Sequence, residues 1–515
     1  MKNNLAQFLA KRAALNPRLE ALVDVATGRR FTYAKLNSQA NRMAHALTGL
    51  GVRKGDRVAT LLMNGLEFVE TFFGGAKIGT VLTPLNWRLV ADELAFILTD
   101  SGAETLVFGR EFRTVVADLH ARGRQGTAVR TWIYVGKPAD RPPFAVSYDD
   151  LHGAASARES EIMAENDDLL YVMYTSGTTG LPKGAMHSHG TTMWAVLTLC
   201  ATADLRFKDR YLICLPLFHV GALTPLLATV YVGGTHVIMR EFDPVRIWQV
   251  FQQERITNAL AVPTMLQFML QTYDATSPDV SGLRWILSGG SPVPVPLIER
   301  YAKLGIEIHQ TYGLTESGGP ACLIAPDEAI TRAGSTGKAF FHTDVRIVDE
   351  RGADVEPNVP GEILVRGPHV MLGYWNQPAA TAEAIRDGWL HTGDVAIVDG
   401  EGFVYIHDRL KDMIISGGEN IYPAEIENVI LGHPGVAEVA VIGVPSAKWG
   451  ESPVAVVVSK DTALTDQDVL GHCAGKLARY KIPKRVHFTE AIPRTPTGKA
   501  LKRLLREQFR EPAPE

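Results

Sequence analysis

A stretch rich in glycine and hydroxyl residues, at positions 174–184, carries the most specific chemical signal in this 515-residue sequence. It reads Tyr-Thr-Ser-Gly-Thr-Thr-Gly-Leu-Pro-Lys-Gly and follows an apolar, β-prone run, which predicts a loop that leaves a buried strand. Glycines let the backbone approach a phosphate closely, while hydroxyls, N–H groups and a lysine donate to its oxygens. We therefore expect a polyphosphate, with ATP as the first choice, to bind this loop through Thr175, Ser176, Gly177, Thr178, Thr179, Gly180 and Lys183.

The stretch differs from the common P-loop, in which a Gly-Lys-Ser/Thr string follows a glycine and four further residues. Lys183 instead lies between Pro182 and Gly184, so no serine or threonine stands beside it to hold magnesium. A flexible polar surface loop is the alternative that its composition alone would favour. The ordered ending Leu-Pro-Lys-Gly argues against it, and with this string the sequence resembles the adenylate-forming superfamily. That superfamily includes acyl-CoA synthetases, 4-coumarate–CoA ligase, firefly luciferase and the adenylation domains of peptide synthetases.

Three further strings match the body of that superfamily in order. The string at 215–223, Leu-Pro-Leu-Phe-His-Val-Gly-Ala-Leu, contains a histidine that would ordinarily be a packed core residue. The resemblance places this residue in the wall of an acyl pocket and not as a general base. In the strings at 287–292 and 309–317, the resemblance implies contacts with adenine, phosphate and Mg²⁺, which suits a carboxylate together with nucleotide phosphates. The residues concerned are His219 for the acyl group, Gly289, Gly290 and Tyr312 for adenine, Thr315 for phosphate and Glu316 for Mg²⁺.

The resemblance continues into the last part of the chain. Asp394, in Gly-Trp-Leu-His-Thr-Gly-Asp, corresponds to the carboxylate that accepts from the ribose hydroxyls, and Arg409 to a contact with ribose or phosphate. Lys411 corresponds to the hinge of the family, and Gly418 to the glycine along which the pantetheine of coenzyme A passes. The string Pro-Arg-Thr-Pro-Thr-Gly-Lys ends at Lys499, the expected catalytic lysine, which would act together with Thr175 and Glu316.

The reaction implied by this resemblance is activation of a carboxylic acid by ATP. The products of the first step would be acyl-AMP and pyrophosphate, and the acyl group would then pass to coenzyme A. Residues 409–427 are most similar to bacterial fatty-acyl-CoA ligases, which favours a fatty acid as the substrate. An aryl-CoA synthetase of the 4-coumarate or feruloyl type is the alternative within this chemistry. An ATP-dependent phosphotransferase, which would release ADP or phosphate, is the alternative from another class, while a light-emitting oxygenase or a carrier-loading domain has no motif in its favour.

A basic cluster, Arg-Phe-Lys-Asp-Arg at 206–210, precedes the string that holds His219. It is either a solvated loop or a lid that contacts anionic lipid, where hydrophobic acids reside. Lys208 stands where the family pattern has an arginine. The positive charge is kept, but the planar set of N–H donors of a guanidinium is lost. The acid, its chain length and the oligomeric state remain open.

Composition restricts the class of protein. With 46% apolar residues, 21% charged residues and a net charge of −4, the chain is typical of a soluble globular protein and gives no nucleic-acid signature. Its four cysteines are scattered, which favours reduced thiols in the cytoplasm over disulfides or zinc. Residues 211–239 lack charged side chains, but prolines, glycines and histidines interrupt them, so a buried core is expected rather than a membrane span.

The elements that must position these residues follow an α/β pattern. Apolar strands alternate with helices up to about residue 335, which predicts layered, mostly parallel sheets. Shorter, glycine-rich β segments follow and predict a small barrel or sheet on that body. After residue 408 the pattern becomes that of a small α+β unit. We expect an AMP-binding and acyl-binding domain at 1–408 and a mobile domain with the catalytic lysine at 409–515.

Overall fold

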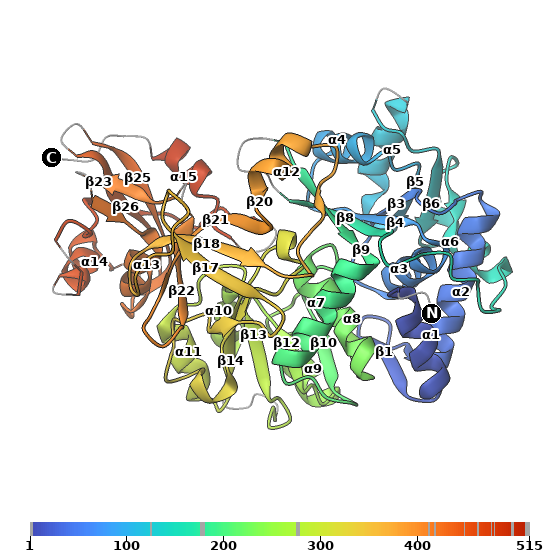
Figure 1. Cartoon of the computed structure of the whole chain (residues 1–515), viewed down its shortest axis with the longest axis horizontal. Coiled ribbons are helices and arrows are strands. Elements are labelled where there is room, and N and C mark those ends of the chain that lie inside the picture. The colour runs from blue at the N-terminus through green and yellow to red at the C-terminus, as the bar shows by residue number, and fades with distance from the viewer. Residues whose placement is uncertain are drawn as a thin grey trace.

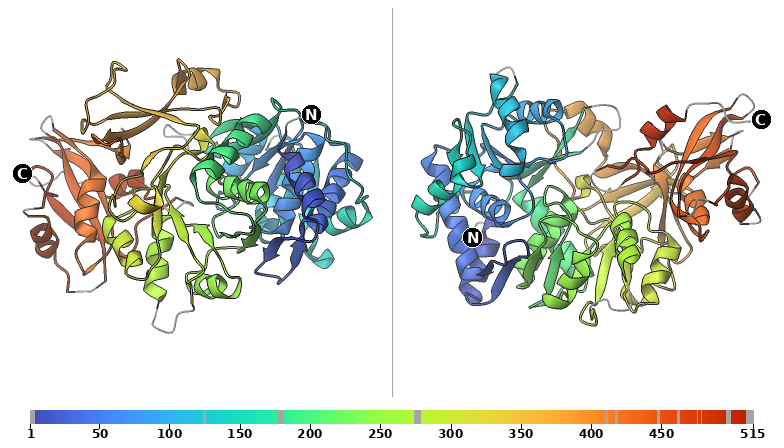
Figure 2. Two further views of the ribbon diagram at one scale, coloured as in Figure 1. Left: turned by 60° about the horizontal axis from the view of Figure 1, so that its bottom comes forward. Right: turned by 180° about the vertical axis from the view of Figure 1, so that it is seen from behind.

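The computed structural model describes residues 4–123, 126–175, 181–273, 279–409, 412–416, 419–446, 449–460, 463–474, 476–477, 479–495 and 499–509, with only the backbone at 408, 409, 419 and 420. Its elements form a large body that extends to β22 (Val404–Arg409) and a small C-terminal unit that begins with β23 (Ile414–Ser416). Figure 1 shows this unit at one end of the molecule and the N-terminal elements at the opposite end, and the views in Figure 2 agree.

The first sheet of the body has eight strands, and those at its centre run parallel. An antiparallel hairpin of β8 and β9, followed by β19, completes one edge. In spatial order the strands are β19 (Gly373–Tyr374), β9 (Lys183–Ser188), β8 (Leu169–Thr175), β4 (Val81–Pro84), β3 (Arg57–Leu61), β5 (Thr105–Gly109), β6 (Thr131–Val135) and β7 (Val146–Ser147). The helices between these strands and before them are α2 (Tyr33–Gly49), α3 (Leu66–Ile78), α4 (Ala91–Ser101), α5 (Arg113–Ala121) and α6 (Tyr148–Ala154).

The second sheet has nine strands, again parallel at the centre and antiparallel at both edges. Its order is β16 (Lys338–Ala339), β15 (Cys322–Leu323), β14 (Ile308–Tyr312), β13 (Trp285–Ser288), β12 (Asn258–Leu260), β10 (Arg210–Ile213), β11 (Thr235–Ile238), β1 (Glu20–Asp24) and β2 (Arg30–Thr32). Its helices are α1 (Ala6–Leu15), α7 (His189–Thr202), α8 (Val220–Val232), α9 (Arg246–Gln253), α10 (Pro263–Thr272) and α11 (Val295–Ala302).

One continuous apolar core joins the two sheets, because α1, α2, α3, α7 and α8 all contribute buried side chains to it. A second core lies between α4, α5 and the first sheet. α8 is apolar on every side, as a helix buried in a large core should be. The uncharged segment at 211–239 is therefore β10, α8 and β11, which confirms its prediction as core. No helix in the described part of the chain is long and apolar enough to cross a bilayer.

The third sheet is antiparallel and stands where the sequence predicted a small β unit. It consists of β17 (Asp344–Val348), β18 (Gly361–Arg366), β20 (Ile385–Arg386), β21 (Trp389–Val398) and β22, with α12 (Pro378–Ala384) beside it. β21 is the longest of these strands and pairs with β18, β20 and β22. Its middle carries Asp394, the candidate ribose contact, which pairs with Arg409 of β22 and lies at the irregularity in the pairing of β21 with β18.

The C-terminal unit is a sheet with helices and its own two apolar clusters. The strands are β24 (Glu419–Ile421), β23, β26 (Gly450–Ser459) and β25 (Val436–Ser446), with β27 (Arg485–Phe488) parallel to β26. The helices are α13 (Pro423–Leu431), α14 (Asp466–Cys473) and α15 (Lys502–Gln508). Proline stands in the first turn of α13, where its missing N–H has no helical partner to lose. The predicted fold class, a large α/β body with a small α+β unit, is confirmed.

Candidate active site

The glycine-rich stretch connects β8 to β9 as a hairpin, with Thr175 paired to Lys183 at its base. Of the predicted phosphate-binding residues, these two are described, and both lie at the mouth of the loop. The other five, Ser176, Gly177, Thr178, Thr179 and Gly180, lie outside the described residues. A hairpin differs from the strand-to-helix turn of a P-loop, which agrees with the distinct spacing of the sequence.

Glu316 lies in a short 3₁₀ turn (Thr315–Ser317) shortly after β14. Its Oε1 accepts hydrogen bonds from the Tyr374 hydroxyl at 2.9 Å and from Thr175 Oγ1 at 3.4 Å. The Lys183 ammonium lies 5.2 Å from the centre of the Tyr374 ring. Two strings far apart in the sequence therefore meet at one carboxylate, and a tyrosine that sequence reasoning missed joins them.

Backbone contacts hold the turn around Glu316. The carbonyl oxygens of residues 315, 316 and 317 accept from His187 Nε2 at 2.8 Å, Met371 N at 2.8 Å and His369 Nδ1 at 2.7 Å. Burial lowers the pKa of His187 to about 4 and also lowers the pKa of His369. Both rings are neutral at physiological pH, and each donates from the nitrogen that faces the turn.

The residues predicted to contact adenine and ribose also lie next to each other. The Tyr312 hydroxyl donates to Asp394 Oδ2 at 2.7 Å, and burial, followed by that carboxylate, raises the Tyr312 pKa well above its usual value. Gly290 follows β13 with φ +83°, and a Cβ on Gly289 would lie 2.3 Å from the Thr311 carbonyl oxygen. Only glycine fits at 289, which leaves a backbone edge against which a flat base could lie.

His219 precedes α8 at the other side of the site. Its Nε2 is shielded from solvent and has no hydrogen-bond partner among the described residues. Burial, followed by the positive charges of Arg88 and Lys499, lowers its pKa to about 3. The Phe218 ring lies 4.4 Å from the His219 ring and 6.0 Å from that of Trp87. A neutral imidazole among aromatic rings suits the predicted wall of an apolar pocket.

The positive charge of Lys499, in the C-terminal unit, contributes to the lowered pKa of His219 in the body, after burial and the charge of Arg88. Its backbone closes a small loop with Thr495 by two hydrogen bonds, Thr495 N to Lys499 O at 2.7 Å and Lys499 N to Thr495 Oγ1 at 3.0 Å. An ion pair of 2.5 Å between Arg494 and Glu438 anchors the same loop to β25. The predicted hinge Lys411 and the predicted CoA glycine Gly418 lie outside the described residues, and Arg409 is placed only as a β22 partner of Asp394.

The donor set fits a magnesium ion that a nucleotide brings with it. Within the described ranges no group of three or more histidine, cysteine, aspartate or glutamate side chains could hold a metal. Glu316 offers a carboxylate beside the candidate phosphate loop, and Mg²⁺ commonly binds through one or two carboxylates plus phosphate oxygens and waters. The arrangement can therefore polarise a phosphate only when nucleotide and metal are present together.

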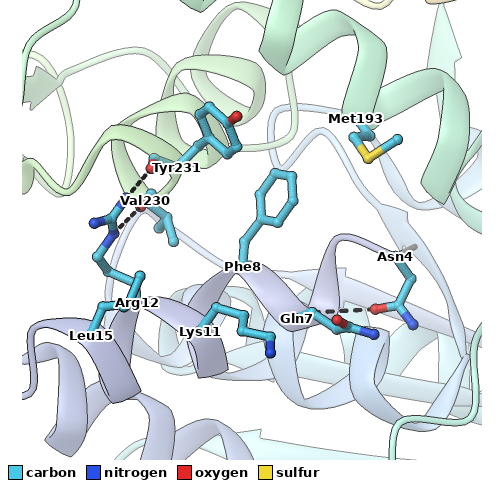
Figure 3. Close-up of a pocket in the computed structure, with 9 residues that line it drawn as sticks. All are labelled: Asn4, Gln7, Phe8, Lys11, Arg12, Leu15, Met193, Val230 and Tyr231. Carbon is cyan, nitrogen blue, oxygen red and sulfur yellow. Dashed lines mark hydrogen bonds between the residues drawn. The ribbon is translucent and has the colours of Figure 1, made fainter. Parts of the chain in front are cut away.

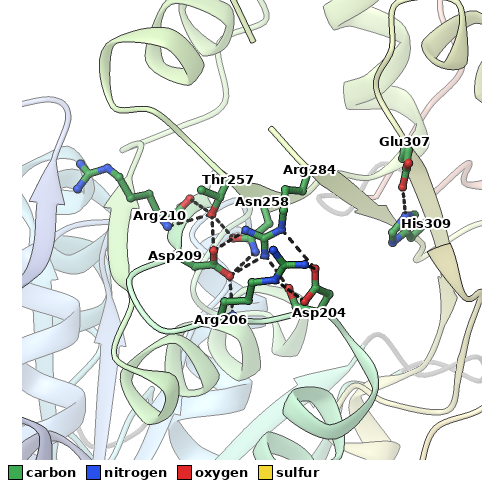
Figure 4. Close-up of polar contacts among 9 residues, drawn as sticks. All are labelled: Asp204, Arg206, Asp209, Arg210, Thr257, Asn258, Arg284, Glu307 and His309. Carbon is green, nitrogen blue, oxygen red and sulfur yellow. Dashed lines mark hydrogen bonds and ion pairs between the residues drawn. The ribbon is translucent and has the colours of Figure 1, made fainter. Parts of the chain in front are cut away.

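The basic cluster at 206–210 divides into an anchored part and an exposed part, and Figure 4 shows Asp209 of the anchored part beside Arg284. Arg210 forms ion pairs of 2.6 Å with both Glu20 and Glu254, so neither alternative for the cluster, a solvated loop or a lipid-facing lid, describes this residue. Asp209, 3% exposed, pairs with Arg284 at 2.6 Å and fixes the end of the loop. Phe207 is 52% exposed and lies close to Lys208, whose φ is +69°.

A surface hollow of about 270 Å³ adjoins this loop, between α1, α7 and α8 (Figure 3). Its lining is mixed, with the apolar Phe8, Leu15 and Tyr231 next to the basic Lys11 and Arg12. The Arg12 guanidinium and the Phe207 ring both lie against Gly233, which makes the hollow and the loop one surface.

Comparison with known proteins places the site in context. A family model described as AMP-binding enzyme matches residues 9–375, and one described as AMP-binding enzyme C-terminal domain matches residues 425–499. The long-chain-fatty-acid–CoA ligase FadD13 of Mycobacterium tuberculosis is 44% identical over 99% of this chain and 100% of its own, and a feruloyl-CoA synthase of Amycolatopsis is 42% identical over the same shares. The structure of o-succinylbenzoate CoA synthetase from Bacillus subtilis, in complex with its acyl-adenylate intermediate, has a TM-score of 0.86 and 34% identity over 98% of both chains.

Proposed function

The chain belongs to the AMP-binding enzyme family, and we propose that it acts as an AMP-forming ligase of fatty acids and coenzyme A. A carboxylate attacks the α-phosphorus of ATP, which gives acyl-AMP and pyrophosphate. The thiol of CoA then attacks the acyl carbon and releases AMP. The observation that carries this proposal is the contact of Thr175, at the base of the glycine-rich stretch, with the carboxylate of Glu316.

The acyl group lies beside His219 in this proposal. A charged imidazole would need solvation that the apolar wall cannot give, and its low pKa keeps the ring neutral. The apolar α8, which begins directly after His219, extends the wall and favours an aliphatic chain. Phe218 and Trp87 would serve a flat ring equally well. The feruloyl-CoA synthase among the relatives keeps an aryl acid as the second candidate.

Adenylation must bring two anions together, so positive charge at the phosphates governs its rate. Lys183 and Lys499 supply that charge, and Glu316 would hold Mg²⁺, which neutralises phosphate oxygens when it is bound. Opposite charges about 4 Å apart interact by about 4 kcal/mol at an effective dielectric near 20. A single lysine of this kind is therefore enough to determine whether the first step occurs.

Nucleotide recognition in this proposal uses the edge built by β13, β14 and β21. Adenine lies against Gly289, Gly290 and the Tyr312 ring, the ribose hydroxyls donate to Asp394, and Arg409 lies near ribose or phosphate. Thr315 and the residues 175–180 contact the phosphates. The existing hydrogen bond between Tyr312 and Asp394 supports the proposal, because it orients the carboxylate before ribose arrives.

The second step requires CoA to reach the same acyl carbon. We propose that residues 409–515 turn about Lys411, withdraw Lys499 and bring Gly418 beside the pantetheine. The two apolar clusters of this unit include no residue of the body, so it can turn without opening the core of either part.

The surface formed by the hollow and the exposed part of the basic loop is proposed to meet anionic lipid, as a peripheral contact of a cytoplasmic enzyme. Replacing Arg206 and Lys208 by serine should weaken binding to phosphatidylserine vesicles by about 1 kcal/mol per residue, and less at high salt. The same change at Arg346 and Arg366 of the third sheet is the control. Equal binding by both double variants would contradict a lipid-facing loop.

A screen of pyrophosphate release tests the main proposal. Short, medium, long and aromatic acids are compared with and without CoA, and the nucleotide product is identified. AMP, pyrophosphate and an acyl-CoA from fatty acids are expected. ADP or inorganic phosphate as the product would overturn the ligase in favour of a phosphotransferase, and a preference for aromatic acids would select the aryl-CoA alternative.

A further inference from the structure

Tyr374 connects the phosphate loop to the candidate metal ligand. It lies on β19, in register with Ala185 of β9, the strand that leaves the loop. Trp375 N donates to Gly184 O at 2.7 Å, and Tyr374 N donates to Thr381 Oγ1 at 2.8 Å. The backbone of Tyr374 is therefore held on the far side of the hairpin from the rest of the first sheet.

Among the described residues, the side chain of Tyr374 contacts one anion and one cation. Its hydroxyl donates to Glu316 Oε1 at 2.9 Å, and its ring lies 5.2 Å from the Lys183 ammonium. A cation is attracted to the face of an aromatic ring, while a hydroxyl bond to a carboxylate is charge-assisted. One side chain thus contacts both the cation of Lys183 and the anion of Glu316.

The two hydrogen bonds that hydroxyl groups donate to Glu316 are accepted by the same carboxylate oxygen. Tyr374 and Thr175 both donate to Oε1, and within the described residues no hydrogen bond is made to Oε2. Carboxylates that ligate metals are usually hydrogen-bonded by an outer shell, and loss of such a partner typically costs 10- to 100-fold in metal affinity. Glu316 is thus prepared to accept a cation through Oε2.

We propose that Tyr374 is a positioning residue of the adenylation site, which aims Glu316 Oε2 at the nucleotide-borne magnesium and keeps Lys183 free for phosphate. This inference rests on the proposed role of Glu316 as the metal ligand. Tyr374 touches neither substrate nor metal, and it acts through the carboxylate and the lysine. The hydroxyl orients the carboxylate that would bind the metal, and the ring positions the lysine.

The two functions of the side chain can be separated by mutation. Tyr374→Phe removes the hydroxyl alone, so the Mg²⁺ concentration for half-maximal pyrophosphate release should rise by about tenfold. Tyr374→Leu also removes the ring, so it should raise the KM for ATP in addition. Tyr405→Phe is the matched control, because it removes a hydroxyl that faces Asp399 on the third sheet. Transfer of supplied acyl-AMP to CoA should continue at the wild-type rate in every variant, which also shows that each is folded.

Metal binding itself is measured by Mn²⁺ titration, followed by electron paramagnetic resonance, in the presence of α,β-methylene-ATP. Tyr374→Phe should weaken binding by the same factor as it raises the Mg²⁺ requirement, and Glu316→Gln should weaken it at least as much. If Glu316→Gln leaves Mn²⁺ binding unchanged, the metal assignment fails. If Glu316→Gln weakens it and Tyr374→Phe does not, the metal assignment stands and the role of Tyr374 is overturned.

Discussion

The two charged groups expected to act on the phosphates, Glu316 and Lys499, are held in opposite ways. The turn of Glu316 is fixed by His187, Met371 and His369 from separate elements of the body. The loop of Lys499 is closed by its own residue Thr495 and belongs to a unit with a separate core. The carboxylate is held in place by the body, whereas the lysine belongs to the unit that we propose can turn away.

This contrast matches a requirement of the two-step reaction. Nucleotide and metal must stay bound to the same groups until pyrophosphate leaves, which favours a rigid turn. The lysine side chain would occupy the space through which CoA must approach in the second step. A unit that can move away is therefore a suitable place for it. The predictions below test the two sides of this comparison, beginning with the largest expected effect.

Lys499→Ala should reduce adenylation by about 10²- to 10³-fold, because one preorganised charge donor is lost at the developing negative charge. Transfer of supplied acyl-AMP to CoA should be nearly unchanged. Pyrophosphate release and thioester formation are measured separately. The control is Lys484→Ala, at an exposed lysine of the same unit. Near-normal pyrophosphate release by Lys499→Ala would remove this residue from the mechanism.

Lys411→Pro should have the reverse pattern. Proline fixes φ near −65° and restricts Leu410 before it, so a hinge at this position would lose its second arrangement. We expect acyl-AMP to form and its transfer to CoA to fall by about 10²-fold, as for other misplacements at a reacting centre. Lys411→Ala keeps the backbone free and is the control. Proportionate loss of both steps, or of neither, would show that the pivot lies elsewhere.

Acid should affect the body through its buried histidines. Burial lowers the pKa of His236 to about 3 from 6.5, and neither ring nitrogen has a partner among the described residues. The unfolded chain binds a proton below pH 6.5 and the folded chain does not until about pH 3, so stability falls as pH drops through this window. Between pH 7 and pH 5 the loss is about 2 kcal/mol for one such site.

His236→Phe should remove that loss, because phenylalanine occupies a similar volume and does not titrate. Denaturant unfolding of wild type and variant at pH 7 and pH 5, followed by a probe in the body, gives the difference. The variant should be at least as stable as wild type at pH 7 and less sensitive to acid. An identical fall in stability for both proteins would show that His236 is already protonated in the folded state at pH 5.

The sequence predicted the fold class and the identity of the main groups, because glycine spacing and apolar runs are local properties. That Thr175 and Glu316 belong to one site was predicted from the resemblance to the family and not from the residues themselves. Tyr374 was missed because a tyrosine after a glycine has no distinctive chemistry until a fold brings it to Glu316. The ion pairs of Arg210 could not be predicted for the same reason, since its partners Glu20 and Glu254 are remote in sequence.

The smallest expected effect tests how the C-terminal unit is held in the arrangement seen here. Gln267 of α10 donates from Nε2 to the Ala437 carbonyl of β25, a hydrogen bond between the body and the unit. Burial lowers the pKa of Lys460 in the unit, and the charge of Arg300 on α11 lowers it further, which is a repulsion between the body and the unit. One attraction and one repulsion suit the proposed turning of the unit, in which this interface would form and separate.

Gln267→Ala should therefore weaken this arrangement by about 1 kcal/mol, the usual net value of one hydrogen bond, and slow adenylation by about fivefold. Arg300→Glu should act in the opposite sense, since it replaces the repulsion of Lys460 by an attraction. It should leave adenylation intact and slow the transfer to CoA, because the unit would leave less readily. Single-turnover rates of both steps distinguish the cases. If the two variants change the same step in the same direction, the contact contributes to folding and does not select between the two arrangements.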